Sequence, residues 1–279
     1  MSIDSISLYL MSEHPRDAAR TLQQFEPQEL GAYLENLAVP VAADIFKFMV
    51  PSIAVETLKE MSLEKSTKII MQLGVERGTL LMRRMSAGIK QEFISRMSPV
   101  FANMARLVLR YPEGTVGYCM NPNVITVDQD LDVEQVMKVI RNSAEILKNE
   151  IFVTDNDQHL TGVVQSKDIL IAAPELAIKK LMKTPNHIIP ARSNIKSVKS
   201  IVDWQLQDSF PVVDHQGVFV GALYRSTLIE STNTEGMHHD ADGLTGVALA
   251  VAELFWDACS NIIVPEHQNN DKGATGNGN

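Results

Sequence analysis

The chain has few cysteines, and they form no recognisable metal or disulfide pattern. Its 279 residues include only Cys119 and Cys259, and there is no CxxC motif. This spacing argues against a disulfide framework and favours a reducing compartment. A basic-then-apolar leader is also missing, because Glu13 and Asp17 come too early for one. We therefore expect a cytoplasmic protein.

Long hydrophobic runs are missing as well. The most apolar stretch, residues 244–264, is interrupted at helical spacing by Glu253, Asp257 and Asn261. Such a segment is a poor membrane span and is typical of an amphipathic helix. We therefore expect no membrane span, and we expect residues 244–264 to form a docking or dimerisation helix.

Positive charge is in deficit, because the formal net charge is −9. This argues against nucleic acid or an anionic membrane as the main partner. It fits a cation ligand or a basic partner, and it fits an ordinary solvated surface equally well. The sequence also lacks any Ser/His/Asp, Cys/His or paired-carboxylate arrangement typical of a catalyst, which predicts a protein that is not an enzyme.

What the chain does have is a twelve-residue repeat in its first hundred residues. Two columns of the repeat, three positions apart, are apolar in all seven units. The first column is Leu22, Leu34, Phe46, Leu58, Ile70, Met82 and Ile94, and the second is Phe25, Leu37, Met49, Met61, Leu73, Met85 and Met97. A spacing of three is helical. We expect both columns to be buried.

One continuous helix does not explain this period. Twelve residues advance a helix by about 1200°, which is about 120° past full turns, so the columns would fall on three faces. The repeat therefore predicts short helices separated by turns. Pro27, Pro40, Pro51 and Pro99 lie near the breaks, where we expect proline to stop a helix. Paired helices of this length stack into a superhelix.

The pattern changes to alternating strands and helices after Pro112, and it occurs twice. Strand-like residues 151–153 and 160–164 flank an acidic turn, and a similar pair flanks Asp214. The strand pairs align at an offset of 59 residues, whereas Met120 aligns with Met182 at an offset of 62. We interpret this as an internal duplication of a β-α-β-β-α unit, with three extra residues in the first copy.

These residues carry a family resemblance. The segments 116–120 (VGYCM) and 162–168 (GVVQSKD) resemble a CBS domain, and the second copy resembles another, so that together they look like a Bateman module. The repeats and residues 111–120 (YPEGTVGYCM) are similar to the helical N domain and the junction of MgtE-type magnesium channels. The chain resembles the cytosolic region of such a channel without its transmembrane pore.

The predicted fold class is α+β and multidomain, with an N-terminal all-α superhelix of short repeats followed by a tandem CBS pair. We expect a helical domain at 1–112, CBS domains at 113–178 and 179–232, and a polar linker, amphipathic helix and disordered tail at 233–279.

The CBS resemblance implies binding of an adenine nucleotide, ATP or AMP. The family signature ends in an Asp, whose two oxygens can accept both ribose hydroxyls. In the first copy this residue is Asp168, but Gln165 stands at the usual Ser/Thr position. Asp168 could instead cap or hydrogen-bond its own helix, and Lys167 could face a phosphate or be a solvated helix residue. The base is expected against apolar strand residues near Ile125 and Val153.

The second copy departs further from the signature. Gly221 is retained, but Tyr224 replaces the Ser/Thr and Thr227 replaces the Asp. At most one ribose-binding carboxylate is therefore expected in the pair.

The channel resemblance also implies magnesium sensing through carboxylates at domain junctions. The candidates are Glu26, Glu35, Asp44, Glu56, Asp128, Asp130, Asp132 and Glu134. None of them can be matched to a ligand of the family, and ordinary solvated acids are the alternative. Gly114 and Thr227 stand where the family often has acidic residues, which weakens the implied Mg²⁺ site.

The sequence therefore predicts a cytosolic regulatory protein. An adenine nucleotide or a divalent cation bound to the CBS pair would be relayed through the helical domain to a partner, and a homodimer through the CBS domains is implied by the family. One alternative is an accessory or degenerate relative of a magnesium transporter that acts in magnesium homeostasis. Another is a purely structural adaptor with inactive ligand sites.

Overall fold

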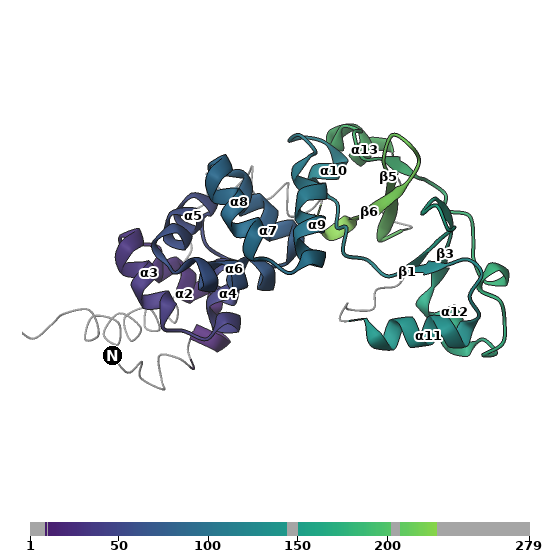
Figure 1. The fold of residues 1–279 in the computed structure, drawn as a ribbon, viewed down its shortest axis with the longest axis horizontal. Coiled ribbons are helices and arrows are strands. Elements are labelled where there is room, and N and C mark those ends of the chain that lie inside the picture. The colour runs from purple at the N-terminus through teal and green to yellow at the C-terminus, as the bar shows by residue number, and fades with distance from the viewer. Residues whose placement is uncertain (1–8, 10, 144–149, 202–206, 228–279) are drawn as a thin grey trace, which may run out of the picture.

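The computed structural model describes Tyr9 and residues 11–143, 150–201 and 207–227. These residues form two lobes, one made of short helices and one that contains two small sheets (Figure 1). The expected polar linker, amphipathic helix and disordered tail at 233–279 lie outside the described residues.

The first lobe is a stack of short helices separated by tight turns. Its helices are α2 (Pro15–Leu22), α3 (Pro27–Glu35), α4 (Val39–Phe46), α5 (Pro51–Glu60), α6 (Leu63–Gln72), α7 (Gly74–Arg83), α8 (Ala87–Arg96) and α9 (Pro99–Leu109). Helices α2, α4, α6 and α8 contact one another in that order, and so do α3, α5, α7 and α9. This two-layer stack confirms the predicted superhelix of short repeats.

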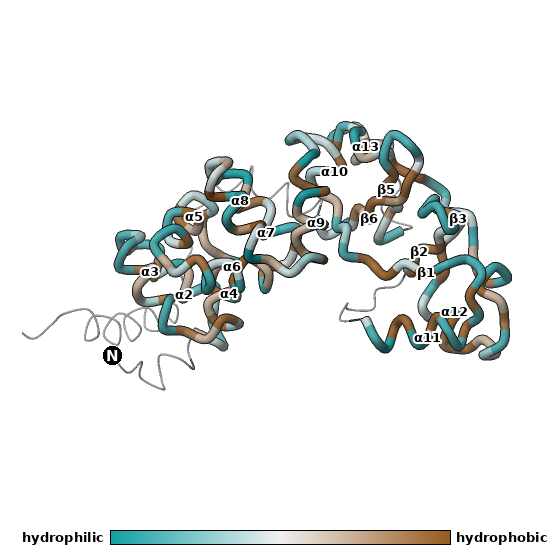
Figure 2. The backbone as a smooth tube through the Cα atoms, viewed as in Figure 1, coloured by the Kyte–Doolittle hydropathy of each residue, from teal (hydrophilic) through white to brown (hydrophobic). Residues whose placement is uncertain are grey.

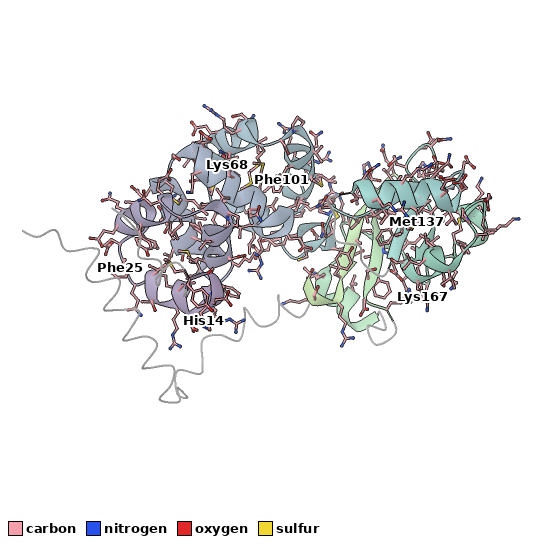
Figure 3. The ribbon with its side chains drawn as sticks, turned by 90° about the horizontal axis from the view of Figure 1, so that it is seen from below. His14, Phe25, Lys68, Phe101, Met137 and Lys167 are labelled. Carbon is pink, nitrogen blue, oxygen red and sulfur yellow. The ribbon has the colours of Figure 1, made fainter. Side chains whose placement is uncertain are left out.

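The two apolar columns form the core of this stack. All seven residues of the first column are buried, and so are six residues of the second. Phe25, which lies in the turn between α2 and α3, is partly buried against the same core (Figure 3). The structure therefore confirms the register of the twelve-residue repeat.

The prolines mark the breaks between helices in a different way from the one expected. Pro27, Pro51 and Pro99 are the first residues of α3, α5 and α9, and Pro40 is the second residue of α4. They begin the next helix, because the first turn needs no proline N–H donor and the fixed φ of proline suits a helix. The expectation that these prolines stop the preceding helix was wrong.

The second lobe holds two three-stranded sheets of the same design. The first unit contains β1 (Thr126–Asp128), α11 (Val133–Asn142), β2 (Glu150–Thr154), β3 (Leu160–Gln165) and α12 (Ser166–Ile171), and the second contains β4 (Ile189–Pro190), α13 (Ile195–Ile201), β5 (Ser209–Val213) and β6 (Phe219–Tyr224). Helix α10 (Val116–Cys119) precedes the first unit, and a 3₁₀ turn (Ile178–Lys180) precedes the second. Figure 2 shows hydrophobic and hydrophilic residues alternating along α11.

The pairing of the strands confirms the duplication residue by residue. In each sheet the first strand is parallel to the second, and the second is antiparallel to the third. Val153 lies opposite Gly162, and Val212 opposite Gly221, with an irregularity after each valine. In the first strands, Val127 pairs with Val153 and Ile189 pairs with Val212. The second and third strands of the two sheets are therefore related by 59 residues, and the first strands by 62 residues.

The two units exchange their leading segments. Asn121, which precedes the first unit, pairs with Ala222 in β6 of the second unit. Lys183, which precedes the second unit, pairs with Val163 in β3 of the first. His159 and Val218, which are equivalent residues, pair with each other and mark the pseudo-twofold axis. Each sheet is therefore completed by residues that belong to the other unit.

The two lobes share a hydrophobic core. Buried residues from α9 are continuous with Val116 and Met120 around α10, and with Ile189 and Phe210 of the second sheet. The N–H of Gly117 donates to Ala191 O at 2.7 Å. The first sheet has a separate core, so the helical lobe is joined to the pair mainly through its second unit (Figure 1).

Arg83 reinforces this joint from the end of α7. Its guanidinium donates to Val108 O at 2.7 Å and to Tyr111 O at 2.9 Å, and it lies 4.0 Å from the centre of the Tyr118 ring. Burial lowers the pKa of Arg83 and raises the pKa of Tyr118, because a partly dry site disfavours the charged form of each group.

Candidate functional site

The candidate nucleotide-binding residue, Asp168, lies in the first turn of α12, directly after β3. Its Oδ2 atom is 3.3 Å from the Nζ atom of Lys183. The side chain of Asp168 is 23% exposed and that of Lys183 is 64% exposed. The carboxylate is therefore accessible to a ligand, and a cation already stands beside it.

Asp168 does not cap its own helix. The N-cap of α12 is Gln165, and no side chain caps this helix end. The interaction of Asp168 that the structure records is with Lys183, which lies outside its own helix. Lys167, one residue earlier, is exposed in the lobe that contains the two sheets (Figure 3).

The backbone of Lys183 is fixed by the exchange between the units. Its N–H donates to Val163 O at 2.8 Å, and its O accepts from the N–H of Val163 at 2.9 Å. A Cβ atom on Gly162 would lie 3.1 Å from the Cβ of Met182 and 3.2 Å from the O of Lys183. The glycine of the signature therefore permits the close approach that places Lys183 next to β3.

The expected base-binding residues lie in the core of the first unit. Ile125 is 8% exposed and Val153 is fully buried, and both pack in the same hydrophobic cluster. Val153 thus offers no surface to a ligand in this conformation. Ile125 lies at the edge of the same cluster and retains a small accessible area.

The equivalent position in the second unit carries different chemistry. Thr227 occupies the place of Asp168, and Asn121 occupies the place of Lys183. The Oδ1 atom of Asn121 accepts from the N–H of Asn123 at 2.7 Å, so this side chain serves its own turn. The charged pair therefore belongs to the first unit alone.

The carboxylates proposed for magnesium are spread over the molecule and already have partners in several cases. Glu35 accepts from both the N–H and the hydroxyl of Ser62, and Asp132 caps α11. Asp130 pairs with Lys179 at 2.5 Å. Other candidates pair along their own helices, namely Asp44 with Lys47, Glu56 with Lys59, and Glu134 with Lys138.

Glu134 illustrates how these pairs behave. Its hydrogen bond and its charge raise the pKa of Lys138, because both favour the protonated ammonium. Within the described ranges, no group of three or more His, Cys, Asp or Glu side chains could hold a metal ion.

Sequence reasoning missed Lys183 and Arg83, and it also missed Glu150. The Oε2 atom of Glu150 accepts from the hydroxyl of Ser209 at 2.5 Å, and these two residues are equivalent in the two units. The 59-residue offset could have paired them. The 62-residue offset could have identified Lys183 as the equivalent of Asn121, but it could not have shown that Lys183 lies beside Asp168.

The helical stack, the duplicated sheets and the exchanged segments define a CBS-pair protein with a helical N-terminal domain. Residues 13–114 match the family described as the MgtE intracellular N domain, and residues 116–175 match the CBS domain. The chain is homologous to the cytosolic region of MgtE magnesium transporters. The matched families are not enzyme families.

Two curated relatives are magnesium transporters named MgtE. The one from Bacillus subtilis (strain 168) is 21% identical over 229 residues, which are 77% of this chain and 51% of the relative. The one from Thermus thermophilus is 25% identical over 134 residues, which are 46% of this chain and 30% of the relative. The chain thus spans at most about half of the length of these relatives.

Two solved structures share the fold. The cytosolic domain of the Mg²⁺ channel MgtE in complex with ATP has a TM-score of 0.69 and 20% identity, covering 80% of this chain and 93% of that one. The soluble part of a magnesium transporter has a TM-score of 0.59 and 15% identity, covering 82% and 98%. No helix among the described residues is long and apolar enough to cross a bilayer.

Proposed function

We propose that this protein is a regulatory module in which an adenine nucleotide binds beside Asp168 and changes how the helical domain engages a partner. The accessible carboxylate of Asp168 is the observation that carries this proposal. An ionised carboxylate accepts two hydrogen bonds and so suits the two ribose hydroxyls. The flanking cations Lys167 and Lys183 suit the phosphates. The donor set therefore fits a nucleotide.

The comparison supports the same ligand class. The related MgtE cytosolic domain, which has this fold, is described in complex with ATP. In this chain the nucleotide would lie at the first unit, with its ribose on Asp168 and its base near Ile125. Gln165 would flank the ribose, because it ends β3 directly before α12.

The relay would use the joint between the lobes. The helical domain is tied to the second unit by the shared core, Arg83 joins the end of α9 to α10, and the two units complete each other's sheets. A change at β3 of the first unit would thus reach β4 to β6 and then α9. A homodimer through the CBS domains and a protein partner at residues 244–264 belong to the same proposal, as does a cytoplasmic location.

Magnesium homeostasis is the second candidate function, and homology to magnesium transporters favours it. The chain would then act as an accessory or degenerate relative of such a transporter. The described carboxylates form no group of three that could hold a metal ion, so this candidate rests on the homology alone. A structural adaptor with inactive ligand sites is the outcome expected if neither ligand binds.

Calorimetry with ATP, AMP and Mg²⁺ tests these alternatives. Asp168→Ala should lose about 1.5–3 kcal/mol of nucleotide binding, the range for hydrogen bonds to a charged group. Thr227→Ala is the matched control at the equivalent position and should change affinity little. Stronger loss in Thr227→Ala would place the nucleotide in the second unit. The absence of nucleotide binding by the wild type at millimolar ligand would favour the adaptor.

A further inference from the structure

The pair Asp168–Lys183 joins two parts of the chain that the sequence keeps apart. Asp168 belongs to α12 of the first unit, whereas Lys183 precedes β4 and belongs to the second. Only the exchange of leading segments brings the ammonium and the carboxylate to 3.3 Å. Before any ligand binds, the ammonium of Lys183 therefore occupies the carboxylate that would accept the ribose hydroxyls.

The two ends of Lys183 behave differently. Its backbone is held by two hydrogen bonds to Val163, but its side chain is largely exposed and touches only one recorded partner, Asp168. At 3.3 Å and with this exposure, the ion pair is a weak one of the surface type. The long flexible stem of lysine can therefore turn its ammonium to a new anion while the backbone stays in place.

From this geometry we infer that Lys183 is a nucleotide-binding residue that exchanges partners, leaving Asp168 for the phosphate chain when ribose hydroxyls occupy the carboxylate. This inference rests on the proposed nucleotide function and names the residue that selects for phosphate. The loss of one ion pair is offset by a stronger one, since a phosphate chain carries more negative charge than one carboxylate.

The same geometry restricts the phosphate-dependent site to one unit. In the second unit Asn121 replaces Lys183, and its side chain oxygen already accepts from Asn123. Thr227 cannot act as a carboxylate there either. Phosphate selectivity should therefore come from the first unit, and one nucleoside polyphosphate should bind per chain.

The test compares ATP with adenosine, because adenosine keeps the base and the ribose but has no phosphate. Lys183→Met, which keeps the length of the stem and removes the charge, should weaken ATP about tenfold. Adenosine affinity should stay unchanged or rise a few fold, because its ribose no longer competes with Lys183. Lys183→Arg keeps the charge and should retain most of the preference for ATP. The full chain is used throughout, with calorimetry at two salt concentrations.

Lys179→Met is the matched control, because Lys179 lies four residues earlier and is paired with Asp130 instead. It should leave both affinities unchanged. Equal loss of ATP and adenosine in Lys183→Met, or no loss of either, would overturn the role of Lys183 while the nucleotide site itself stands. A wild type that binds neither compound would overturn the proposed function and this inference together. Thermal melts of each variant check that the exposed substitutions leave the fold intact.

Discussion

At the scale of single residues, Arg83 connects α7 with two other helices of the chain. It supplies two donors to carbonyls at the end of α9 and stacks on Tyr118 in α10. The planar fork of a guanidinium can do all of this at once, and an ammonium cannot. The residue therefore fixes the last helix of the stack to the first turn of the CBS pair.

Arg83→Ala should lower the free energy of unfolding by about 2–4 kcal/mol, because it leaves two half-buried carbonyls without their charged donor. Arg83→Lys should recover less than half of this loss. Arg84→Ala, at the exposed neighbouring position, should cost under about 0.5 kcal/mol. Denaturant unfolding followed by circular dichroism measures all three, and similar losses for Arg83→Ala and Arg84→Ala would contradict the bridging role.

At the scale of the element, α6 shows how one helix of the repeat divides its faces. Ile70→Ala should cost about 2–5 kcal/mol, since this side chain is fully buried in the stack. Lys68→Ala should cost under about 0.5 kcal/mol, because Lys68 makes only an exposed pair with Glu64 on the outer surface (Figure 3). Equal costs in urea unfolding would show that the buried register is wrong.

The third strands of the two sheets offer a second comparison. Gly221 has φ +149, and a Cβ atom there would lie 2.5 Å from the O of Asn121. At Gly162, its equivalent, a Cβ would meet the Cβ of Met182 at 3.1 Å and the O of Lys183 at 3.2 Å, which is a wider clearance. Gly221→Ala should therefore cost about 2–4 kcal/mol and Gly162→Ala about 1 kcal/mol, from strain and close contact. Thermal unfolding that ranked the two in the reverse order would contradict the close approach at Asn121.

At the scale of the whole molecule, the proposed assembly is a homodimer. The full chain should scatter light as a dimer at micromolar concentration, since the CBS resemblance implies pairing of two chains. Residues of α12 support an interface, because Leu170 and Ile171 are exposed there. Burial of such a patch favours association. Leu170→Asp should shift the mass toward the monomer, and a wild type that is monomeric would remove the dimer from the proposal.

The sequence predicted the architecture well because its signals are periodic. The twelve-residue columns identified the core of the stack, and the 59- and 62-residue offsets matched the observed strand registers. Contacts between distant segments could not be read in this way. Lys183 reaches Asp168 only through the exchange between units, and Arg83 reaches α9 only after the helices have stacked.

The prolines show a different limit. A proline near a break fits the end of one helix and the start of the next equally well in a single sequence. The turn geometry decides between them, and here it places Pro27, Pro51 and Pro99 in first helical positions.

The exchanged leading segments also bear on how such a pair could have arisen. A chain with a single unit would have no second copy to provide the segment that lies beside Val163, so it could complete its sheet only with a segment from another molecule. Duplication in tandem turns that intermolecular exchange into a contact within one polypeptide. For the same reason, a fragment cut between Ala177 and Lys183 would leave the edge of β3 bare and prone to pair with a neighbouring molecule.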